Sequence, residues 1–457
     1  MHDPQQTIVA VATPPGRGGV GCVRLSGLAA PQIARVLFVP AAGAPPPGPS
    51  APPVFGRFLG RAGRPIDHGY LVLFPPGGSF TGEPTAELWA HGSPAVLDEL
   101  VAAALAEGAL LAGPGEFTYR AVQNGRLDLT RAEAVRDLVQ ARTAYQARVA
   151  FAQAEGALSR RLRPLREELE KWIARGEAAV EFAEESETHL PAGRLAAAIA
   201  GAMGSCRDLL DGFRAGRVVR DGATLAMVGL PNVGKSSLFN RLLARERAIV
   251  AAQAGTTRDT LEEELDLEGI PLRLIDTAGL RDVSDEVEQE GVRRAQRARD
   301  EADLVLLVLD GARGVEPAEA EALRRSLEAP EAPRTIVVVN KCDLAGARTR
   351  SIPHPRPFPV SAASGEGLGA LRAELRARLV VGGLVEDPVV TNRRHAVALE
   401  QTLEALARAA AAAGEGLSEE LVVEDLRQAL RQLGEITGEF TSEALYDRIF
   451  STFCIGK

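Results

Sequence analysis

The chain has 457 residues, of which 46% are hydrophobic and 25% charged, and a formal net charge of −9. Its length favours about three domains, and its composition favours a folded globular protein. No apolar run reaches the roughly 20 residues that cross a bilayer, and the N-terminus lacks the pattern of a secretory signal. We therefore expect a cytoplasmic protein with no membrane contact. The negative charge argues against strong non-specific binding to nucleic acid but permits a local basic surface.

Residues 1–125 alternate short strand-like runs with turns and helices, which predicts an α+β domain. The runs TIVAVAT and GVGCVRLSG are expected strands, PQIARVLFV is an expected helix, and Ser93–Ala106 is a second, apolar helix. The Pro-rich stretch Ala41–Pro53 is interpreted as a surface loop or linker.

From about Thr130, apolar residues recur at three- and four-residue spacing, which predicts long amphipathic helices broken once at Pro164. A similar pattern returns after residue 395. We expect residues 126–217 and 384–457 to form one helical domain, into which the region between them is inserted. Two unrelated helical modules are the alternative.

The inserted region, residues 218–383, contains continuous apolar runs separated by helical segments, a pattern typical of a parallel α/β sheet. Between a predicted strand and a predicted helix, Gly229–Ser236 reads GLPNVGKS and matches the phosphate-binding loop GxxxxGK[ST]. Lys235 is expected to neutralise phosphates and Ser236 to bind Mg²⁺. Taken alone, the run is also consistent with an accidental Gly-rich turn.

Three further motifs follow it along the chain. DTAG at Asp276–Gly279 is expected to face Mg²⁺ and a γ-phosphate, and NKCD at Asn340–Asp343 to select guanine. SAA at Ser361–Ala363 is a weaker base-contacting loop, for which a helix N-cap is the alternative. The order and spacing predict a Ras-like GTP-binding domain, whose expected nucleotide contacts are Asn232, Val233, Gly234, Lys235, Ser236, Ser237, Gly255, Thr256, Thr257, Asp276, Thr277, Ala278, Gly279, Asn340, Lys341, Asp343, Ser361, Ala362 and Ala363.

The groups that hydrolyse GTP are less evident. Leu280 follows DTAG, so the usual water-positioning glutamine is absent. In the candidate switch loop Gly255–Asp259, Thr257 is the natural Mg²⁺ ligand, and Asn232 in the phosphate loop could help to hold a monovalent cation. The acidic run DVSDEVEQE contains Glu288 and offers carboxylates, although most of the run is expected to be a solvated segment.

Motifs outside this domain carry a resemblance that covers nearly the whole chain. They are ATPPGRGGVGCVRLSG, SFTGE at Ser79–Glu83, the run GPGEFTYRAVQNGRLDLTRAEAV from Gly113, and the terminal FCIGK. Together they are similar to the MnmE (TrmE) family of tRNA wobble-uridine modification GTPases. The resemblance implies an N-terminal α+β folate-binding and dimerising domain, a discontinuous helical domain, and an inserted Ras-like P-loop G domain.

The resemblance also implies an activity. Members are potassium-dependent GTPases that form homodimers and act with the flavin- and NADH-using partner MnmG in a heterotetramer or larger complex. Together they add an aminomethyl-type (carboxymethylaminomethyl) group to C5 of the tRNA wobble uridine, and GTP drives pairing of the G domains. The implied cofactors are GTP, Mg²⁺, K⁺ and 5-formyltetrahydrofolate or a related tetrahydrofolate.

Carried onto this sequence, the resemblance assigns several residues. The potassium site matches Asn232, Ala251, Gln253 and Thr256; the Mg²⁺ ligands match Ser236 and Thr257; the residue that positions water matches Glu288; and the folate contacts match Arg24, Glu83, Arg126 and Lys457. Cys454, within FCIGK, is a candidate for a chemical role near the folate, although a lone cysteine is more often inert packing.

Some residues and functions keep an alternative. The arginines of the helical region are interpreted mainly as a solvated face, with a tRNA contact by some of them as the alternative (Arg131, Arg136, Arg142, Arg148, Arg160 and Arg161). Trp89 and His91 are interpreted as core and turn positions, with a ligand pair as the alternative. The competing functions are a ribosome-assembly GTPase of the Era/Der type, which needs a C-terminal RNA-binding domain, and a folate-binding scaffold with a degenerate G domain.

Overall fold

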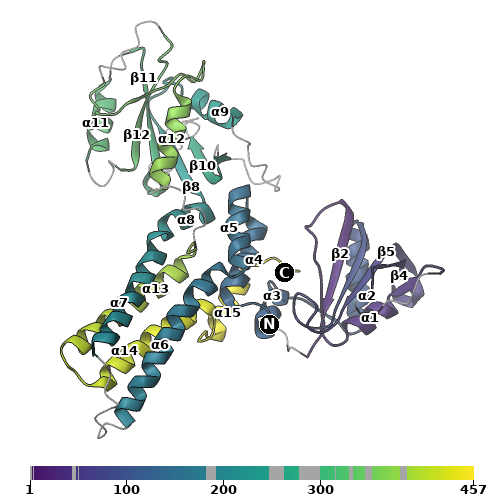
Figure 1. The fold of residues 1–457 in the computed structure, drawn as a ribbon. Helices are drawn as coiled ribbons and strands as arrows, with labels where there is room; N and C mark the ends of the chain where they lie inside the picture. Colours follow the sequence, from purple (N-terminus) through teal and green to yellow (C-terminus); the bar gives the residue numbers. More distant parts are fainter. Residues whose placement is uncertain are drawn as a thin grey trace, which may run out of the picture. The chain divides into compact units, whose positions relative to one another are not determined.

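The computed structural model describes residues 3, 5–43, 48–49, 51–181, 192–245, 262–276, 299–313, 315–328, 333–344, 352–380 and 389–456. It divides into two compact units, which Figure 1 shows coloured along the chain. The first unit comprises Met1–Arg136, Ala154–Leu162 and Arg431–Lys457, and the second Asp137–Gln153 and Arg163–Leu430. Within the described residues, no helix has the length and apolar character needed to cross a membrane. The domain boundaries expected from the sequence stay a prediction.

A seven-stranded sheet forms much of the first unit, in the order β3-β4-β5-β6-β2-β1-β7. Its strands are β1 (Ile8–Val11), β2 (Gly18–Ser26), β3 (Phe38–Pro40), β4 (Val54–Leu59), β5 (Pro65–Phe74), β6 (Thr85–Gly92) and β7 (Leu110–Leu111). Neighbouring strands are antiparallel, except that β1 and β7 are parallel. Helices α1 (Ala30–Val36) and α2 (Pro94–Ala106) cover one face, and the core lies between them and the sheet.

The helix expected over PQIARVLFV is confirmed as far as Val36 and wrong for its last three residues. α1 ends at Val36, and β3 follows, with Phe38 paired to Phe58 of β4. Phe38 is buried and Val39 exposed, which is the alternation of a strand that is covered on one face only. The expected helix at Ser93–Ala106 is confirmed, with Ser93 as its N-cap and Pro94 in its first turn.

The other face of this sheet carries exposed aromatic side chains. Phe55, Tyr70 and Trp89 lie opposite one another on β4, β5 and β6. Because side chains alternate along β6, Leu88 and Ala90 enter the core, while Trp89 and His91 face outward. The interpretation of Trp89 and His91 as core and turn positions is therefore wrong.

The end of the chain packs against the start of the first helical stretch. Helices α3 (Glu116–Gln123), α4 (Leu129–Gln140) and α15 (Glu443–Phe450) enclose a small apolar core that includes Leu129, Phe450 and Phe453. The rings of Tyr119 and Phe453 both contact the ring of Phe450. The FCIGK ending therefore begins with a core residue, Phe453. Full burial of one phenylalanine side chain contributes about 1.5–3 kcal/mol to the free energy of unfolding.

Long helices make up part of the second unit. They are α5 (Ala144–Ala154), α6 (Ala157–Glu181), α7 (Ala192–Asp211), α8 (Phe213–Asp221), α13 (Arg393–Gly414) and α14 (Glu419–Thr437). The start of α6, up to Leu162, and the end of α14, from Arg431, belong to the first unit. α7 packs along α13, and Arg427 of α14 lies 2.6 Å from Glu177 of α6. Helices that precede and follow the six-stranded sheet in the sequence therefore pack against each other.

The helices that follow Thr130 are interrupted at other positions than the single break expected at Pro164. α6 runs through Pro164, so the prediction of a break there is wrong. Pro164 lies on the exposed side of α6 while Leu162 and Leu165 are buried, and this packing outweighs the roughly 3 kcal/mol that an interior proline costs. The helix is interrupted instead at 141–143 and at 155–156, where Gly156 has a φ of +85°.

A six-stranded sheet forms the rest of the second unit, in the order β13-β12-β11-β8-β10-β9. Its strands are β8 (Ala223–Val228), β9 (Glu262–Leu267), β10 (Ile270–Asp276), β11 (Leu304–Asp310), β12 (Thr335–Asn340) and β13 (Phe358–Pro359). β9 is antiparallel to β10, and the other pairs are parallel. Helices α9 (Lys235–Arg245) and α12 (Leu368–Leu379) cover one face and α11 (Pro317–Ser326) the other, which is the architecture of a Ras-like domain.

Candidate functional site

The phosphate loop Gly229–Ser236 follows β8 and opens α9. Gly229, with a φ of +154°, lies so close to β11 that a Cβ would be 2.3 Å from the carbonyl oxygen of Val308. Gly234, with a φ of +93°, would place a Cβ 2.2 Å from Nδ2 of Asn340. Only glycine fits at either position. The loop can therefore curl its N–H groups around an anion at the N-terminus of α9.

Lys235 is the first residue of α9 and is 6% exposed. Its Nζ donates hydrogen bonds to the carbonyl oxygens of Gly229 and Leu230, each at 2.9 Å. A buried ammonium needs such acceptors, and these two hold it inside the curl of the phosphate loop. Ser236 follows on the same turn of the helix and is exposed.

Asn340 joins the three loops that the motifs define. Its Nδ2 donates to the carbonyl oxygen of Val233 at 2.9 Å, and its Oδ1 accepts from the N–H of Ala362 at 3.0 Å. The side chain is 2% exposed, so both hydrogen bonds are shielded from water. The phosphate loop, NKCD and SAA are thereby held as one assembly.

Ser361 is fully buried and does not cap a helix. Its Oγ accepts from the N–H of Ser364 at 3.0 Å, which closes a turn. The next helix, α12, has Gly367 as its N-cap. The alternative of a helix N-cap for SAA is therefore excluded.

Lys341 bridges the phosphate loop and the end of β11. Its Nζ donates to the carbonyl oxygen of Asn232 at 2.9 Å and to Oδ2 of Asp310 at 2.6 Å. Burial opposes the ionisation of Asp310, but hydrogen bonds from Lys341 and from the N–H of Ala312 outweigh it, so the pKa of Asp310 lies below its ordinary value. Asp310 was not anticipated, although it ends the strand LVLLVLD beside Asn340 in the neighbouring strand.

Two further motif residues stand at the surface. Asn232 has a φ of +62°, a conformation that asparagine adopts more readily than most residues, and it is exposed. Asp343 is also exposed. Ser237 is exposed in the first turn of α9, and the carbonyl oxygen of Ala363 accepts from Nη2 of Arg241 at 2.8 Å. Asp276 is placed only as the last residue of β10. The other expected nucleotide, metal and catalytic residues lie outside the described ones: Ala251, Gln253, Gly255, Thr256, Thr257, Thr277, Ala278, Gly279 and Glu288.

A second group of polar side chains lies in the first unit, around α3. Oε2 of Glu83 accepts from Oγ of Ser26 at 2.6 Å, and both Glu83 oxygens lie 3.3 Å from Nη1 of Arg120. Nη2 of Arg120 donates to Glu116 at 3.0 Å, and Arg120 and Glu116 are both buried. The carboxylates thus enclose a buried guanidinium and balance its charge.

Two of the other three expected folate residues border this group. Arg24 pairs with Glu87 across β2 and β6 at 2.9 Å, and its guanidinium lies 5.9 Å from the ring centroid of Phe117. Arg126 is exposed and passes Gly82, where a Cβ would be 3.2 Å from Cγ of Arg126. Within the described residues Arg126 has no carboxylate partner, whereas Arg24 has one.

The C-terminal tail lies against the same unit. The N–H of Gly115 donates to the carbonyl oxygen of Cys454 at 3.3 Å. Gly456, with a φ of +93°, lies so close to β1 that a Cβ would be 2.2 Å from the carbonyl oxygen of Val11. Cys454 is a free, exposed thiol, and Lys457 lies outside the described residues. The tail is therefore fixed to β1 and to the start of α3.

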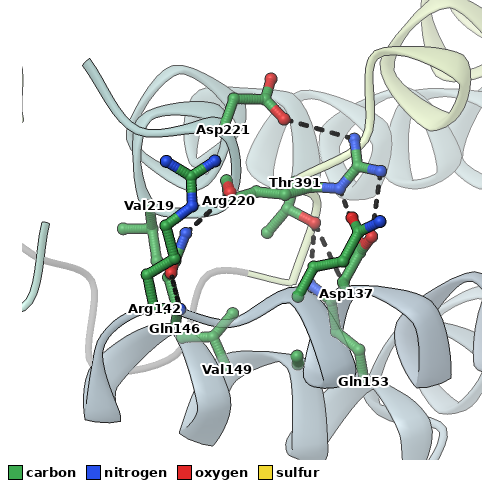
Figure 2. A pocket seen from close by; sticks show the side chains of 11 residues that line it. Asp137, Arg142, Gln146, Val149, Gln153, Val219, Arg220, Asp221 and Thr391 are labelled. Atoms are coloured by element: carbon green, nitrogen blue, oxygen red, sulfur yellow. Dashed lines mark hydrogen bonds and ion pairs between the residues drawn. The ribbon is translucent and has the colours of Figure 1, made fainter. Parts of the chain in front are cut away.

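In the second unit, a hollow of about 210 Å³ lies among α4, α5 and α8, as Figure 2 shows. On one side, Arg220 donates two hydrogen bonds to Asp137, at 2.6 and 3.2 Å. Nε2 of Gln146 donates to the carbonyl oxygen of Arg220 at 2.8 Å, and Nε2 of Gln153 donates to Thr391 at 3.1 Å. These bonds tie α5 to the segments that enter and leave the six-stranded sheet.

The start of α5 also contacts the hairpin between β9 and β10. Thr143 and Gln146 form a capping box at this helix start, with bonds of 3.1 and 3.3 Å. The hydroxyl of Thr143 then donates to the carbonyl oxygen of Gly269 at 2.7 Å, and Arg142 pairs with Glu264. The hairpin connects the two stretches, 251–261 and 277–298, in which the switch residues are expected.

The Ras-like sheet, the glycine-shaped phosphate loop and the loops joined by Asn340 define a P-loop GTPase. A family model described as "MnmE helical domain" matches residues 129–454, and one described as "GTP-binding protein TrmE N-terminus" matches residues 7–126. The chain belongs to the MnmE family of tRNA modification GTPases, so the resemblance drawn from the motifs is confirmed.

Curated relatives named "tRNA modification GTPase MnmE" match over the full length. The protein from Koribacter versatilis is 44% identical, covering 99% of both chains. That from Azoarcus sp. is 45% identical, covering 99% of this chain and 98% of its own. Among solved structures, Era from Aquifex aeolicus is 26% identical over 40% of this chain and 66% of its own, with a TM-score of 0.27, too low to bear on the assignment.

Proposed function

We propose that the chain is a potassium-dependent GTPase that works with a flavoprotein partner of the MnmG type. Together they add a carboxymethylaminomethyl-type group to C5 of the tRNA wobble uridine. The observation that carries this proposal is the full-length match to relatives named tRNA modification GTPases, at 44% identity over 99% of the chain. The intact phosphate and guanine motifs argue against a degenerate scaffold, and the described C-terminal residues form helices rather than the strands of an RNA-binding domain.

In this proposal, the N–H groups of the phosphate loop and Lys235 bind the phosphates, and Asp343 selects guanine by accepting from its two N–H groups. Asn340 keeps Val233 and Ala362 at a fixed separation, so that both ends of the nucleotide meet a preorganised site. Ser236 and Thr257 would hold Mg²⁺, which supplies charge neutralisation at the β- and γ-phosphates. Glu288 acts as the positioning residue for the attacking water.

The proposed potassium ligands are Asn232, Ala251, Gln253 and Thr256. Asn232 supports the proposal because its backbone carbonyl is bound by Lys341 while its side chain is exposed at the rim of the phosphate loop. A monovalent cation there would supply the positive charge that other GTPases obtain from an arginine finger. Pairing of two G domains in the homodimer would complete this site.

The contacts of α5 suggest how a change in the G domain could reach the helices. A shift of the β9–β10 hairpin on GTP hydrolysis would act directly on Thr143 and Arg142, which bond to Gly269 and Glu264. Through Gln146 the same helix start is bonded to Arg220, at the end of α8. A rigid hydrogen-bonded link of this kind can couple two sites.

The proposed folate site comprises Arg24, Glu83, Arg126 and Lys457, for 5-formyltetrahydrofolate or a related tetrahydrofolate. The residues fit such a group: Glu83 offers a fixed carboxylate to N–H donors of a pterin, and Arg126 offers an exposed guanidinium to the acidic tail. The folate would supply a one-carbon unit, and the chain's own residues would bind and orient it. Cys454 stays a candidate for a chemical role beside it.

The test is steady-state GTP hydrolysis by the full chain in potassium buffer and in sodium buffer. We expect potassium to raise the rate on the order of tenfold or more, because a transition-state cation is worth up to about 10⁵ in GTPases. Asn232→Gly removes the side chain but fits the φ of +62°, so it should keep GTP binding and lose the potassium response. Equal rates in both salts would reject the cation mechanism.

A further inference from the structure

Three arginines lie in the first unit where the turn before α4 meets the turn between α5 and α6. Arg131 belongs to the first turn of α4, and Arg160 and Arg161 to the first turns of α6. A Cβ on Gly156 would be 3.6 Å from both Cδ of Arg131 and Nη1 of Arg160. The side chains of Arg131 and Arg160 therefore border the same turn, and we call these two residues, together with the exposed Arg161 that follows Arg160 in the chain, the arginine cluster.

Backbone carbonyls hold two members of the arginine cluster, Arg131 and Arg160. Nε of Arg131 donates to the carbonyl oxygen of Ala154 at 2.8 Å, and Nη1 of Arg160 donates to that of Glu155. Carbonyl acceptors orient a guanidinium without neutralising its charge. Among the described residues, no carboxylate pairs with any member of the cluster, whereas arginines on other exposed helices do pair with one (Arg324, Arg408 and Arg427).

Both carboxylate oxygens of Asp128, which lies beside the cluster, already accept hydrogen bonds from other groups. Oδ1 of Asp128 accepts from the hydroxyl of Thr130 at 2.6 Å and from the N–H of Arg131 at 2.9 Å, and Oδ2 accepts from Ser159 at 2.7 Å. The hydroxyls of Thr130 and Ser159 are 3.0 Å apart, so the first turns of α4 and α6 are bonded together. Two positive helix ends thus lie beside the guanidinium groups of Arg131 and Arg160.

We propose that the arginine cluster binds the phosphate backbone of the tRNA substrate. This inference rests on the proposed function and adds to it the surface that receives the RNA. Guanidinium groups with free N–H bonds bind phosphate oxygens bidentately, and such contacts position a nucleic acid without reading its sequence. Because the whole chain carries a net charge of −9, the attraction has to be local, as this cluster is.

The experiment measures binding of a fluorescent tRNA transcript to the full chain between about 50 and 200 mM salt. The Arg160→Gln/Arg161→Gln variant should bind roughly tenfold more weakly, and its slope of log affinity against log salt should fall by about one for each phosphate that the variant no longer neutralises. Its GTP hydrolysis should be unchanged. Glu155→Gln, which removes the exposed acid beside the cluster, should bind tRNA more tightly.

The matched control is Arg324→Gln/Arg325→Gln, an adjacent exposed pair on α11 that Glu321 already neutralises, and it should bind tRNA normally. If the wild type and the Arg160→Gln/Arg161→Gln variant bind tRNA equally, the surface is rejected while the proposed function stands. If the wild type binds no tRNA, the proposed function fails and the surface with it. If the variant binds tRNA normally but loses its flavoprotein partner, the cluster is a protein contact and the RNA proposal is wrong.

Discussion

The nucleotide loops and the polar group around α3 differ in the atoms to which their side chains bond. In the nucleotide loops, Asn340 and Lys235 bond to backbone atoms of neighbouring loops. Around α3, charged side chains bond to one another, as Glu83, Arg120 and Glu116 do. A ligand of the first region would therefore meet side chains that backbone atoms of neighbouring loops hold in place. A ligand of the second would meet a charge-balanced network, beside which Arg126 offers an exposed guanidinium that no described carboxylate pairs with.

The two regions also differ in which segments of the chain hold them in place. The nucleotide loops are positioned by adjacent parallel strands, whose carboxyl ends meet at one edge of the sheet. The α3 region is assembled from β2, the 79–83 loop, α3 and the last residues of the chain. The structure of the α3 region therefore depends on the docking of the C-terminal tail. The structure of the nucleotide loops does not depend on it.

The largest expected effect concerns the nucleotide loops alone. Glu288→Ala should lower GTP hydrolysis by about 10²- to 10⁴-fold, because the attacking water loses its positioning group. GTP affinity should stay normal, since Lys235 and Asn340 keep their bonds. Single-turnover hydrolysis and equilibrium binding of a fluorescent GTP analogue would separate the two quantities. Glu290→Ala, in the same acidic run, is the matched control, and normal turnover by Glu288→Ala would remove Glu288 from the mechanism.

The two regions also differ in how well the sequence predicts them, because one is built from short contiguous motifs and the other from distant segments. The phosphate loop, NKCD and SAA are short, contiguous motifs, so their residues and their meeting point could be predicted from the sequence. Asp310 was missed because an acid at a strand end is common and nothing local indicates that Lys341 will bind it. Lys341 itself adopts a φ of +65°, which no motif specifies.

The α3 region could be predicted only through the resemblance. That resemblance assigned Arg24, Glu83 and Arg126, but it did not provide their partners Glu87 and Arg120, which lie far from them in the sequence. The helix breaks were missed for a related reason. Periodicity in α4, α5 and α6 is continuous, and the actual interruptions depend on the capping box at Thr143 and on Gly156 rather than on Pro164.

A smaller effect is expected when the tail is disturbed. Gly456→Ala would place a Cβ 2.2 Å from the carbonyl oxygen of Val11 at a φ of +93°, a strain of about 1–3 kcal/mol. We expect roughly 5- to 100-fold weaker binding of 5-formyltetrahydrofolate by isothermal titration calorimetry, and unchanged GTP affinity. Gly416→Ala is the matched control, because Gly416 also has a positive φ, +68°, but nothing within 4 Å. Normal folate affinity in Gly456→Ala would show that the tail takes no part in the site.

The smallest effect tests whether the charge of Asp310 stabilises the nucleotide loops. Its pKa is lowered in the folded chain, so the ionised form contributes stability that is present above the unfolded pKa near 3.8 and is lost as pH falls through the folded value. Asp310→Asn should lower stability at pH 7 by about 1 kcal/mol, the scale of one hydrogen bond. The difference from wild type should shrink below about pH 4. Scanning calorimetry would follow the unfolding transition that GDP shifts, with Asp425→Asn, from the exposed Arg408 pair, as the control that leaves this transition in place. A wild-type–variant difference that does not decrease at all as the pH falls below about 4 would mean that Asp310 acts through packing rather than through its charge.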